Sequence, residues 1–406
     1  MSKTLAIEGG SPAKTGPYTR LPRYGEEELK ELREALEQGT LFYAQGKKVY
    51  ALEEAFAEWV GAKHAVACSS GTASIHTALM AAGISPGDEV IVSPITDLGS
   101  VVPILFQGAV PVFADLDPRN YTMDPSSVEE NIGPKTKAVL AVHLWGNTCD
   151  LDALKDICDR RGLILIEDCA QAWGATYKRR KAGTVGRIGC YSLNEFKHIA
   201  CGDGGLVCTD DDVLARRLRL ATDKGYNREA GAAIRNPTFL AANYRMSELQ
   251  GAVAKAQLPK VDDIVARRRR WVGELMARTA DFPNILPPIP THGCDPSWWF
   301  YMFRAAPGCD ADKIAEALQA EGIPVWAHYI GQCVYEYRLF TDHLAFEHGG
   351  HAYQARVYGK GIAPVAEDIL RDAIILPLHE DFTDRDLDET VEAFIKVGNW
   401  EGAKRV

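Results

Sequence analysis

The segment Lys137-Ala138-Val139-Leu140-Ala141-Val142 is an almost unbroken apolar run, and a second run, Leu163-Ile164-Leu165-Ile166, follows it along the chain. Between the two runs, Asp150 precedes an amphipathic stretch, Leu151 to Cys158, whose free first-turn N–H groups a carboxylate can cap. Apolar runs joined by a helix are typical of parallel strands that helices cover on both faces. This unit therefore predicts an α/β fold.

The same alternation begins near residue 60 and continues on both sides of this unit. The further apolar runs are His64–Cys68, Glu89–Val92, Val110–Phe113, Ile188–Ser192 and Gly205–Cys208. Carboxylates at Asp210 to Asp212 also precede a helical segment that begins at Val213. Together these patterns predict a large domain with a mostly parallel seven-stranded sheet between helices.

The chain has 406 residues, more than one hydrophobic core usually supports, so we expect two domains. Ser247 to Met276 predicts one long helix or two, and the proline-rich segment Asp281 to Pro290 ends it. We expect residues 1–260 to form an N-terminal arm and the large domain, and residues 261–406 a linking helix and a smaller α/β domain. In the smaller domain we expect a strand at Trp298–Arg304 and helices at Asp310–Glu321 and Asp384–Val397. The run Arg267-Arg268-Arg269-Arg270 is most simply a solvated helix face.

The charge balance argues against a nucleic-acid partner. The chain has 45 Lys+Arg against 55 Asp+Glu, a net charge of −10, whereas a protein that binds the phosphate backbone needs a basic surface. No stretch has the ~18 apolar residues that span a bilayer, and the N-terminus has no signal-peptide core. We therefore expect a cytoplasmic protein without membrane contact. The 10 cysteines form no CxxC pair, so no metal site is expected.

Four clusters follow predicted strands or precede helices. The first, Ser69-Ser70-Gly71-Thr72-Ala73-Ser74, opens an apolar helix, and its small residues let N–H groups converge on an anion at the positive end of the helix. Taken alone, this motif is explained more simply by a capped helix. The second cluster contains Asp168, just beyond a buried strand. Asp168 could cap a helix, bind magnesium or keep a heteroaromatic ring nitrogen protonated, and the motif alone leaves all three open.

The third cluster is Tyr191 to His198, followed by the turn Gly202-Asp203-Gly204-Gly205. Lys197 could be solvated, as most lysines are, or partly desolvated, with a lowered pKa that allows a Schiff base with a carbonyl. Its neighbour His198 is expected to be structural. The fourth cluster, Ala242 to Gln250, is by itself a polar turn before a helix.

The order and spacing of these clusters favour a cofactor site. An anion site, an acid at a later strand end and the pair Ser192 and Lys197 match the phosphate, ring nitrogen and aldehyde of pyridoxal phosphate. At these positions the chain resembles the sugar aminotransferase family named after DegT, DnrJ, EryC1 and StrS, a branch of the fold-type I pyridoxal phosphate enzymes. The motifs that carry the resemblance are Ser70-Gly71-Thr72-Ala73, Glu167-Asp168-Cys169-Ala170-Gln171, Ser192 with Lys197 and the glycine turn, and Asn243-Tyr244-Arg245-Met246.

The resemblance implies a role for each matching residue. Lys197 would form the internal aldimine with the cofactor and move the proton during catalysis. Asp168 would pair with the pyridinium nitrogen, and Gln171 would bind near the ring hydroxyl. The residues implied to hold the phosphate are Gly71, Thr72, Ala73 and Ser192. Asn243 would reach the phosphate of a neighbouring subunit, so the resemblance also implies a homodimer with shared active sites.

One position departs from the family pattern. Many members have an aromatic side chain stacked on the cofactor ring, whereas the gapless match places Asp97 there, in Pro94-Ile95-Thr96-Asp97-Leu98-Gly99. Either Leu98 or another side chain covers the ring, or the site suits a different substrate. The aromatic candidates to line the substrate pocket are Trp298, Trp299, Tyr301, Trp326 and Tyr329, and His328 is a further candidate. These rings could equally belong to the hydrophobic core.

The resemblance implies an aminotransferase that moves an amino group from glutamate or glutamine, through pyridoxamine phosphate, to a keto-sugar or keto-cyclitol. A related sugar dehydratase is the first alternative, but that enzyme has histidine where Lys197 stands. A catalytically idle scaffold or sensor is the second, and the joint presence of Lys197, Asp168 and Ser192 argues against it. A dinucleotide-binding dehydrogenase is disfavoured because no GxGxxG follows an early strand.

Overall fold

A computed structural model describes residues 4–229, 232 and 235–405, and its centre is a seven-stranded sheet with the order β1-β9-β8-β5-β4-β2-β3. Strand β9 runs antiparallel to both of its neighbours, and the remaining pairings are parallel. The predicted mostly parallel sheet is therefore confirmed. The strands are β1 His64–Cys68, β2 Glu89–Val92, β3 Val110–Phe113, β4 Thr136–Val142, β5 Ile164–Asp168, β8 Ile188–Ser192 and β9 Gly205–Thr209.

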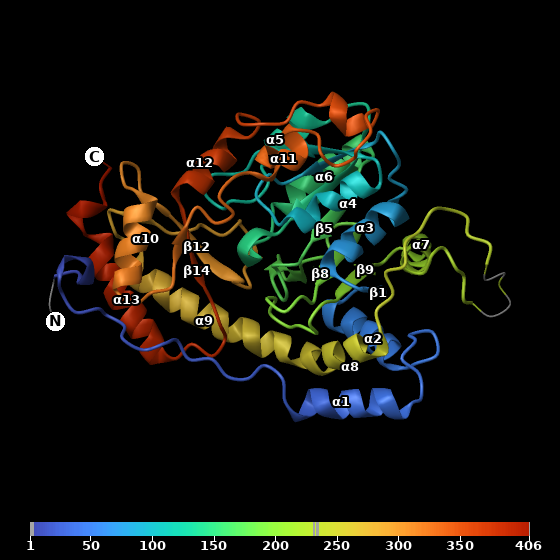
Figure 1. Ribbon diagram of the computed structural model, residues 1–406, viewed down its shortest axis with the longest axis horizontal. Coiled ribbons are helices and arrows are strands. Elements are labelled where there is room, and N and C mark those ends of the chain that lie inside the picture. The colour runs from blue at the N-terminus through green and yellow to red at the C-terminus, as the bar shows by residue number, and fades with distance from the viewer. Residues whose placement is uncertain (1–3, 230–231, 233–234, 406) are drawn as a thin grey trace.

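Helices cover both faces of this sheet (Figure 1). Alternate residues of the central strands point to opposite sides, so Val90 and Ile166 share a core with α3, whereas Ile91 and Leu165 share one with α5 and α6. The helices of this region are α1 Glu26–Glu37, α2 Lys48–Val60, α3 Gly71–Ala82, α4 Val102–Phe106, α5 Pro125–Asn131, α6 Leu151–Arg161 and α7 Asp212–Thr222. Asp150 and Asp211 cap α6 and α7, which confirms the predicted starts.

The predicted helical stretch near residues 247–276 forms two helices, α8 Glu248–Gln257 and α9 Val261–Thr279, joined by a 3-10 turn, Leu258–Lys260. The first half of α9 packs in the core around Trp173, and its second half packs under the C-terminal sheet. The two helices form one long rod across the lower part of the molecule, and α1 lies below its α8 end (Figure 1).

The expectation of a solvated arginine face on α9 is wrong at one position. Arg268 is buried, and its guanidinium bonds the Glu380 carboxylate at 2.7 Å and the carbonyls of Trp298 and Trp299 at 3.2 Å. A buried arginine needs such partners because desolvation of its charge is costly. Arg268 therefore ties the rod to the segment that contains Trp299.

The C-terminal part contains an antiparallel sheet with the order β10-β12-β14-β13 (Figure 1). Helix α10 packs against this sheet, and Phe394 of α13 contacts Phe303 of β12. Its elements are β10 Ile285–Leu286, β12 Phe300–Ala305, α10 Ala311–Ala320, β13 Trp326–Ala327, α11 Arg338–Thr341, α12 Pro364–Asp372, β14 Ala373–Pro377 and α13 Asp384–Gly398. A small third sheet joins β11 Cys294–Asp295 to β6 Thr176–Tyr177 and β7 Arg180–Lys181. In the part of the chain that is described, no helix is both long and apolar enough to cross a bilayer.

The N-terminal arm before α1 runs back along the C-terminal part. Lys14 pairs with Asp386 of α13 at 2.6 Å, and the N–H of Ala6 bonds Glu321 at 2.8 Å. The division at residues 260 and 261 remains our proposal, and in that division the arm packs on the smaller domain.

Candidate active site

Six of the eight predicted site residues gather at the carboxyl end of the parallel strands. Asp168 ends β5, Ser192 ends β8, and Gly71 begins α3 after β1. Open α/β sheets bind ligands at this edge. One cleft lies there, and the predicted residues that line it are Gly71, Thr72, Asp168, Gln171, Ser192 and Lys197.

The start of α3 forms one wall of the cleft. Ser70 caps the helix, and its Oγ accepts the N–H of Ala73 at 3.0 Å. Since the first N–H groups of a helix lack intrahelical acceptors, those of Gly71 and Thr72 remain available to an anion. Gly71 is required here because a Cβ at this position would lie 2.6 Å from the Cβ of Ser192.

Asp168 is the buried acid of the cleft. Its Oδ1 accepts the N–H of Ala170 at 3.0 Å, and its Oδ2 accepts the hydroxyl of Ser100 at 2.7 Å. Burial raises the pKa of Asp168, while these two bonds and the nearby Lys197 oppose that rise. Burial therefore disfavours the ionised carboxylate of Asp168, and its hydrogen-bond donors partly offset this cost.

Lys197 lies half-buried on the loop between β8 and β9. Its Nζ is 3.9 Å from the centre of the Trp299 ring, and the indole N–H of Trp299 donates to the carbonyl of Phe196 at 2.7 Å. Burial lowers the pKa of Lys197, whereas Asp168 and Asp97 act in the opposite direction. The net result enriches the neutral amine, which is the form that attacks a carbonyl.

Gln171 is held in one orientation. Its Oε1 accepts the backbone N–H of Trp145 at 2.8 Å, and its Nε2 faces the hydroxyl of Tyr329 at 3.5 Å. The amide group therefore presents its N–H donors toward Tyr329.

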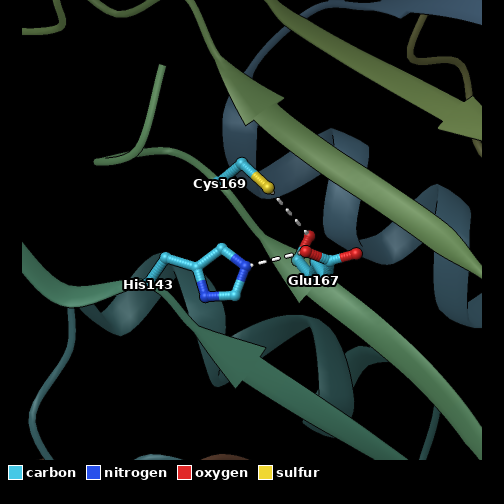
Figure 2. A group of neighbouring side chains, drawn as sticks. All are labelled: His143, Glu167 and Cys169. Atoms are coloured by element: carbon cyan, nitrogen blue, oxygen red, sulfur yellow. Dashed lines mark hydrogen bonds and ion pairs between the residues drawn. The ribbon is translucent and has the colours of Figure 1, made fainter. Parts of the chain in front are cut away.

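Behind Asp168, Glu167 forms a buried anchor that the motif analysis did not single out. Figure 2 shows His143 pointing its ring at Glu167, and the thiol of Cys169 pointing at the carbonyl oxygen of Glu167. The Nε2 of His143 lies 2.9 Å from Glu167, and the Nδ1 accepts the N–H of Cys149 at 3.3 Å. This network places the imidazole proton on Nε2, so the ring donates to the carboxylate. Although burial opposes ionisation, His143 and backbone amides hold the pKa of Glu167 below its ordinary value.

The trio of His143, Glu167 and Cys169 has the composition of a metal site. The carboxylate oxygens of Glu167, however, already accept hydrogen bonds and are not available to a metal. Both carboxylate oxygens accept backbone N–H groups, from Gly183 at 2.7 Å and from Val185 at 2.8 Å. These bonds tie the loop between β7 and β8 to the end of β5. The trio is therefore a structural support for the strand that carries Asp168.

Other predicted residues lie outside the cleft of this chain. Among the described residues, Ala73 and Asn243 do not line it, and Asn243 forms a β-bridge with Asp223. His198 is buried with its Nε2 3.0 Å from the carbonyl of Ser297, a structural position. His328 faces the carbonyl of Leu370 at 3.2 Å, away from the site residues.

The aromatic candidates divide in the same way. Trp298 and Tyr301 are buried in the C-terminal core, and Trp326 is 42% exposed on the surface. Trp299 and Tyr329 contact Lys197 and Gln171, respectively, so these two rings belong to the surroundings of the cleft.

The segment after β2 contributes the face where the family has an aromatic. Asp97 is exposed and lines the cleft, and its Oδ1 accepts the N–H of Gly99 at 2.8 Å. Leu98 packs against the main core instead. The same segment contributes Thr96 and Ser100, which the motif analysis missed. The available signal was the presence of hydroxyl residues in the segment that follows β2, because the segments after parallel strands meet at this edge of the sheet.

The donor set of the cleft fits pyridoxal phosphate. The free N–H groups of Gly71 and Thr72 suit a phosphate, the buried Asp168 suits a protonated ring nitrogen, and the amine of Lys197 suits an aldehyde. Fold and cleft together define a pyridoxal phosphate-dependent enzyme of fold type I.

Comparison with known proteins identifies the family. Residues 22–395 match the DegT/DnrJ/EryC1/StrS aminotransferase family. GDP-perosamine synthase of Caulobacter vibrioides is 36% identical over 87% of this chain and 90% of its own. L-glutamine:2-deoxy-scyllo-inosose aminotransferase of Streptomyces kanamyceticus is 36% identical over 81% of each chain. The crystal structure of S. venezuelae DesV with a ketimine intermediate covers 94% of this chain and 95% of its own, with a TM-score of 0.80 and 31% identity.

The chain therefore belongs to the DegT/DnrJ/EryC1/StrS family of sugar aminotransferases. It is a pyridoxal phosphate-dependent aminotransferase.

Proposed function

We propose that the enzyme transfers the amino group of glutamate or glutamine to the ketone of a sugar or cyclitol. The single observation that carries this proposal is the meeting of Lys197, Asp168 and the start of α3 in one cleft. The names of the two relatives, GDP-perosamine synthase and L-glutamine:2-deoxy-scyllo-inosose aminotransferase, support a sugar or a cyclitol as the acceptor and glutamine as the donor.

When bound, pyridoxal phosphate supplies an aldehyde that takes up the amino group and a ring that withdraws electrons from the substrate carbon. In the proposal, Lys197 would bind the aldehyde and move the proton, and Asp168 would hold the proton on the ring nitrogen. Gly71, Thr72 and Ser192 orient the phosphate, and Ala73 contributes through the helix start. Gln171 lies near the ring hydroxyl.

The enzyme is proposed to work as a homodimer. Asn243 does not line the cleft of its own chain, and its motif matches the family segment that reaches a neighbouring subunit. We therefore propose that Asn243 contacts the phosphate in the partner's cleft, so that each active site needs two chains.

A spectrum of the loaded enzyme tests the donor step. We expect glutamate or glutamine to convert the visible absorbance of the cofactor to that of the amine form, and borohydride reduction before donor addition to label Lys197. Nucleotide-linked keto-sugars and free keto-cyclitols are then compared as acceptors that restore the first spectrum. A spectrum unchanged by amino donors, or a label on another lysine, would reject the proposal.

A further inference from the structure

A chain of two hydroxyl groups leads from the segment after β2 to Asp168. The Thr96 Oγ1 lies 2.7 Å from the Ser100 Oγ, and the Ser100 Oγ donates to the Asp168 Oδ2 at 2.7 Å. All three side chains are buried, with exposed fractions of 2%, 3% and 4%. The bonds therefore form where water does not compete.

The direction of these bonds follows from the number of protons. A hydroxyl has one proton to donate, and a carboxylate can only accept, so the proton of Ser100 is committed to Asp168. Thr96 must then donate its own proton to Ser100. Both protons point toward the acid, and each bond polarises the next, which strengthens the donor that Asp168 receives.

We propose that Ser100, oriented by Thr96, is a positioning residue that keeps Asp168 ionised and fixes its carboxylate plane toward the protonated ring nitrogen of the cofactor. This inference rests on the proposed role of Asp168. Ser100 holds Oδ2 and the N–H of Ala170 holds Oδ1, so the carboxylate is anchored through both oxygens. Each oxygen can accept a further donor, which leaves room for the ring N–H.

The other titratable groups near Asp168 come from different elements. Lys197 approaches from the loop after β8, and His143 lies at the end of β4 with its proton committed to Glu167. Asp97, on the same segment as the hydroxyl chain, acts on Lys197. Removal of either hydroxyl leaves these groups in place, so their contributions are common to all variants compared below.

The test measures the affinity for the cofactor and the pH midpoint of its absorbance, not turnover. In Ser100→Ala, the carboxylate of Asp168 loses a hydrogen-bond donor and becomes more basic. Asp168 then draws the proton of the ring nitrogen further toward itself. The ring then withdraws fewer electrons, so the midpoint for deprotonation of the Lys197 linkage should move to higher pH. The dissociation constant of pyridoxal phosphate should rise by about tenfold, as expected for a lost hydrogen bond to a charged group.

Three further variants separate this role from a structural one. Ser100→Thr keeps the hydroxyl and should restore both readouts. Thr96→Val preserves volume, removes only the first hydroxyl and should cause a smaller shift in the same direction, which keeps the test decisive if Ser100→Ala folds poorly. Ser93→Ala is the matched control, because Ser93 is equally buried on the same segment but donates to the carbonyl of Ile95 at 3.1 Å.

The inference is overturned if Ser100→Ala and Thr96→Val change the midpoint and the affinity no more than Ser93→Ala does. Asp168→Asn separates a failure of the positioning role of Ser100 from a failure of the proposed function of Asp168. If Asp168→Asn shifts the midpoint while the hydroxyl variants do not, only the positioning role of Ser100 fails. If Asp168→Asn also leaves the spectrum unchanged, the proposed function of Asp168 fails with it.

Discussion

Glu167→Gln should destabilise the protein far more than its small chemical change suggests. Glu167 is fully buried and accepts four hydrogen bonds, two at each carboxylate oxygen. The donors are Val185 N and Gly186 N at 2.8 and 2.5 Å, and Gly183 N and His143 Nε2 at 2.7 and 2.9 Å. Glutamine has the same shape, so it creates no cavity, but it replaces one oxygen with an NH₂ group.

The magnitude follows from the donors that lose their acceptor. The amide oxygen can serve one pair, and the NH₂ group then faces the other pair of N–H donors. Each buried donor left unpaired costs roughly 1–3 kcal/mol, so two of them should lower the free energy of unfolding by about 2–6 kcal/mol. Because Asp168 follows directly in the chain, the affinity for pyridoxal phosphate should fall as well.

The assay is urea unfolding of the cofactor-free protein at one fixed protein concentration, with cofactor binding measured separately. Glu129→Gln is the matched control. Glu129 also accepts several hydrogen bonds, from Arg160 and Arg161, but on the surface, where ion pairs contribute little. The reasoning is refuted if Glu167→Gln shifts the unfolding midpoint no further than Glu129→Gln does.

Three further outcomes are expected. Burial lowers the pKa of Lys197 below the ordinary value of a lysine side chain, so reductive methylation of the cofactor-free protein should modify Lys197 at lower pH than it modifies a short lysine peptide. Equal pH profiles by mass spectrometry would contradict this expectation. Asp168→Asn should keep the fold but reduce kcat by about 10²–10³-fold, as for loss of a charged transition-state stabiliser; near-normal turnover would indicate a mere cap, since asparagine caps as well. Mixed Lys197→Ala and Asn243→Ala subunits should regain one complete site per heterodimer, and activity no higher than that of Asn243→Ala alone would reject the shared site.

The large sheet could be predicted from the sequence because its strands are defined locally. The runs His64–Cys68 and Ile188–Ser192 have the predicted bounds, since apolar residues flanked by polar turns leave few alternative ends. The acid and the lysine of the site could be found for a related reason. Asp168 ends β5 and Lys197 follows β8, and parallel strands end at one edge of a sheet, so the predicted parallel sheet already brings the two residues to the same edge.

Other features depended on partners far away in the sequence. Arg268 looked solvated in a run of arginines, yet Glu380 and the carbonyls of Trp298 and Trp299 bury it. Ser100 could not be assigned to Asp168 from spacing, because the bond needs the exact rotation of two side chains on different elements.

The sequence by itself determined the α/β class, the positions of the seven strands to within one or two residues and the residue types of the candidate cofactor site, because periodicity and short motifs act over a few residues. Only the tertiary structure decided that Ser100 donates to Asp168, that Trp299 lies over Lys197 and that Glu167 is saturated by its neighbours. Hydrogen bonds and ring contacts need positions fixed to a fraction of an ångström. Such positions follow from the packing of whole elements, which no local pattern records.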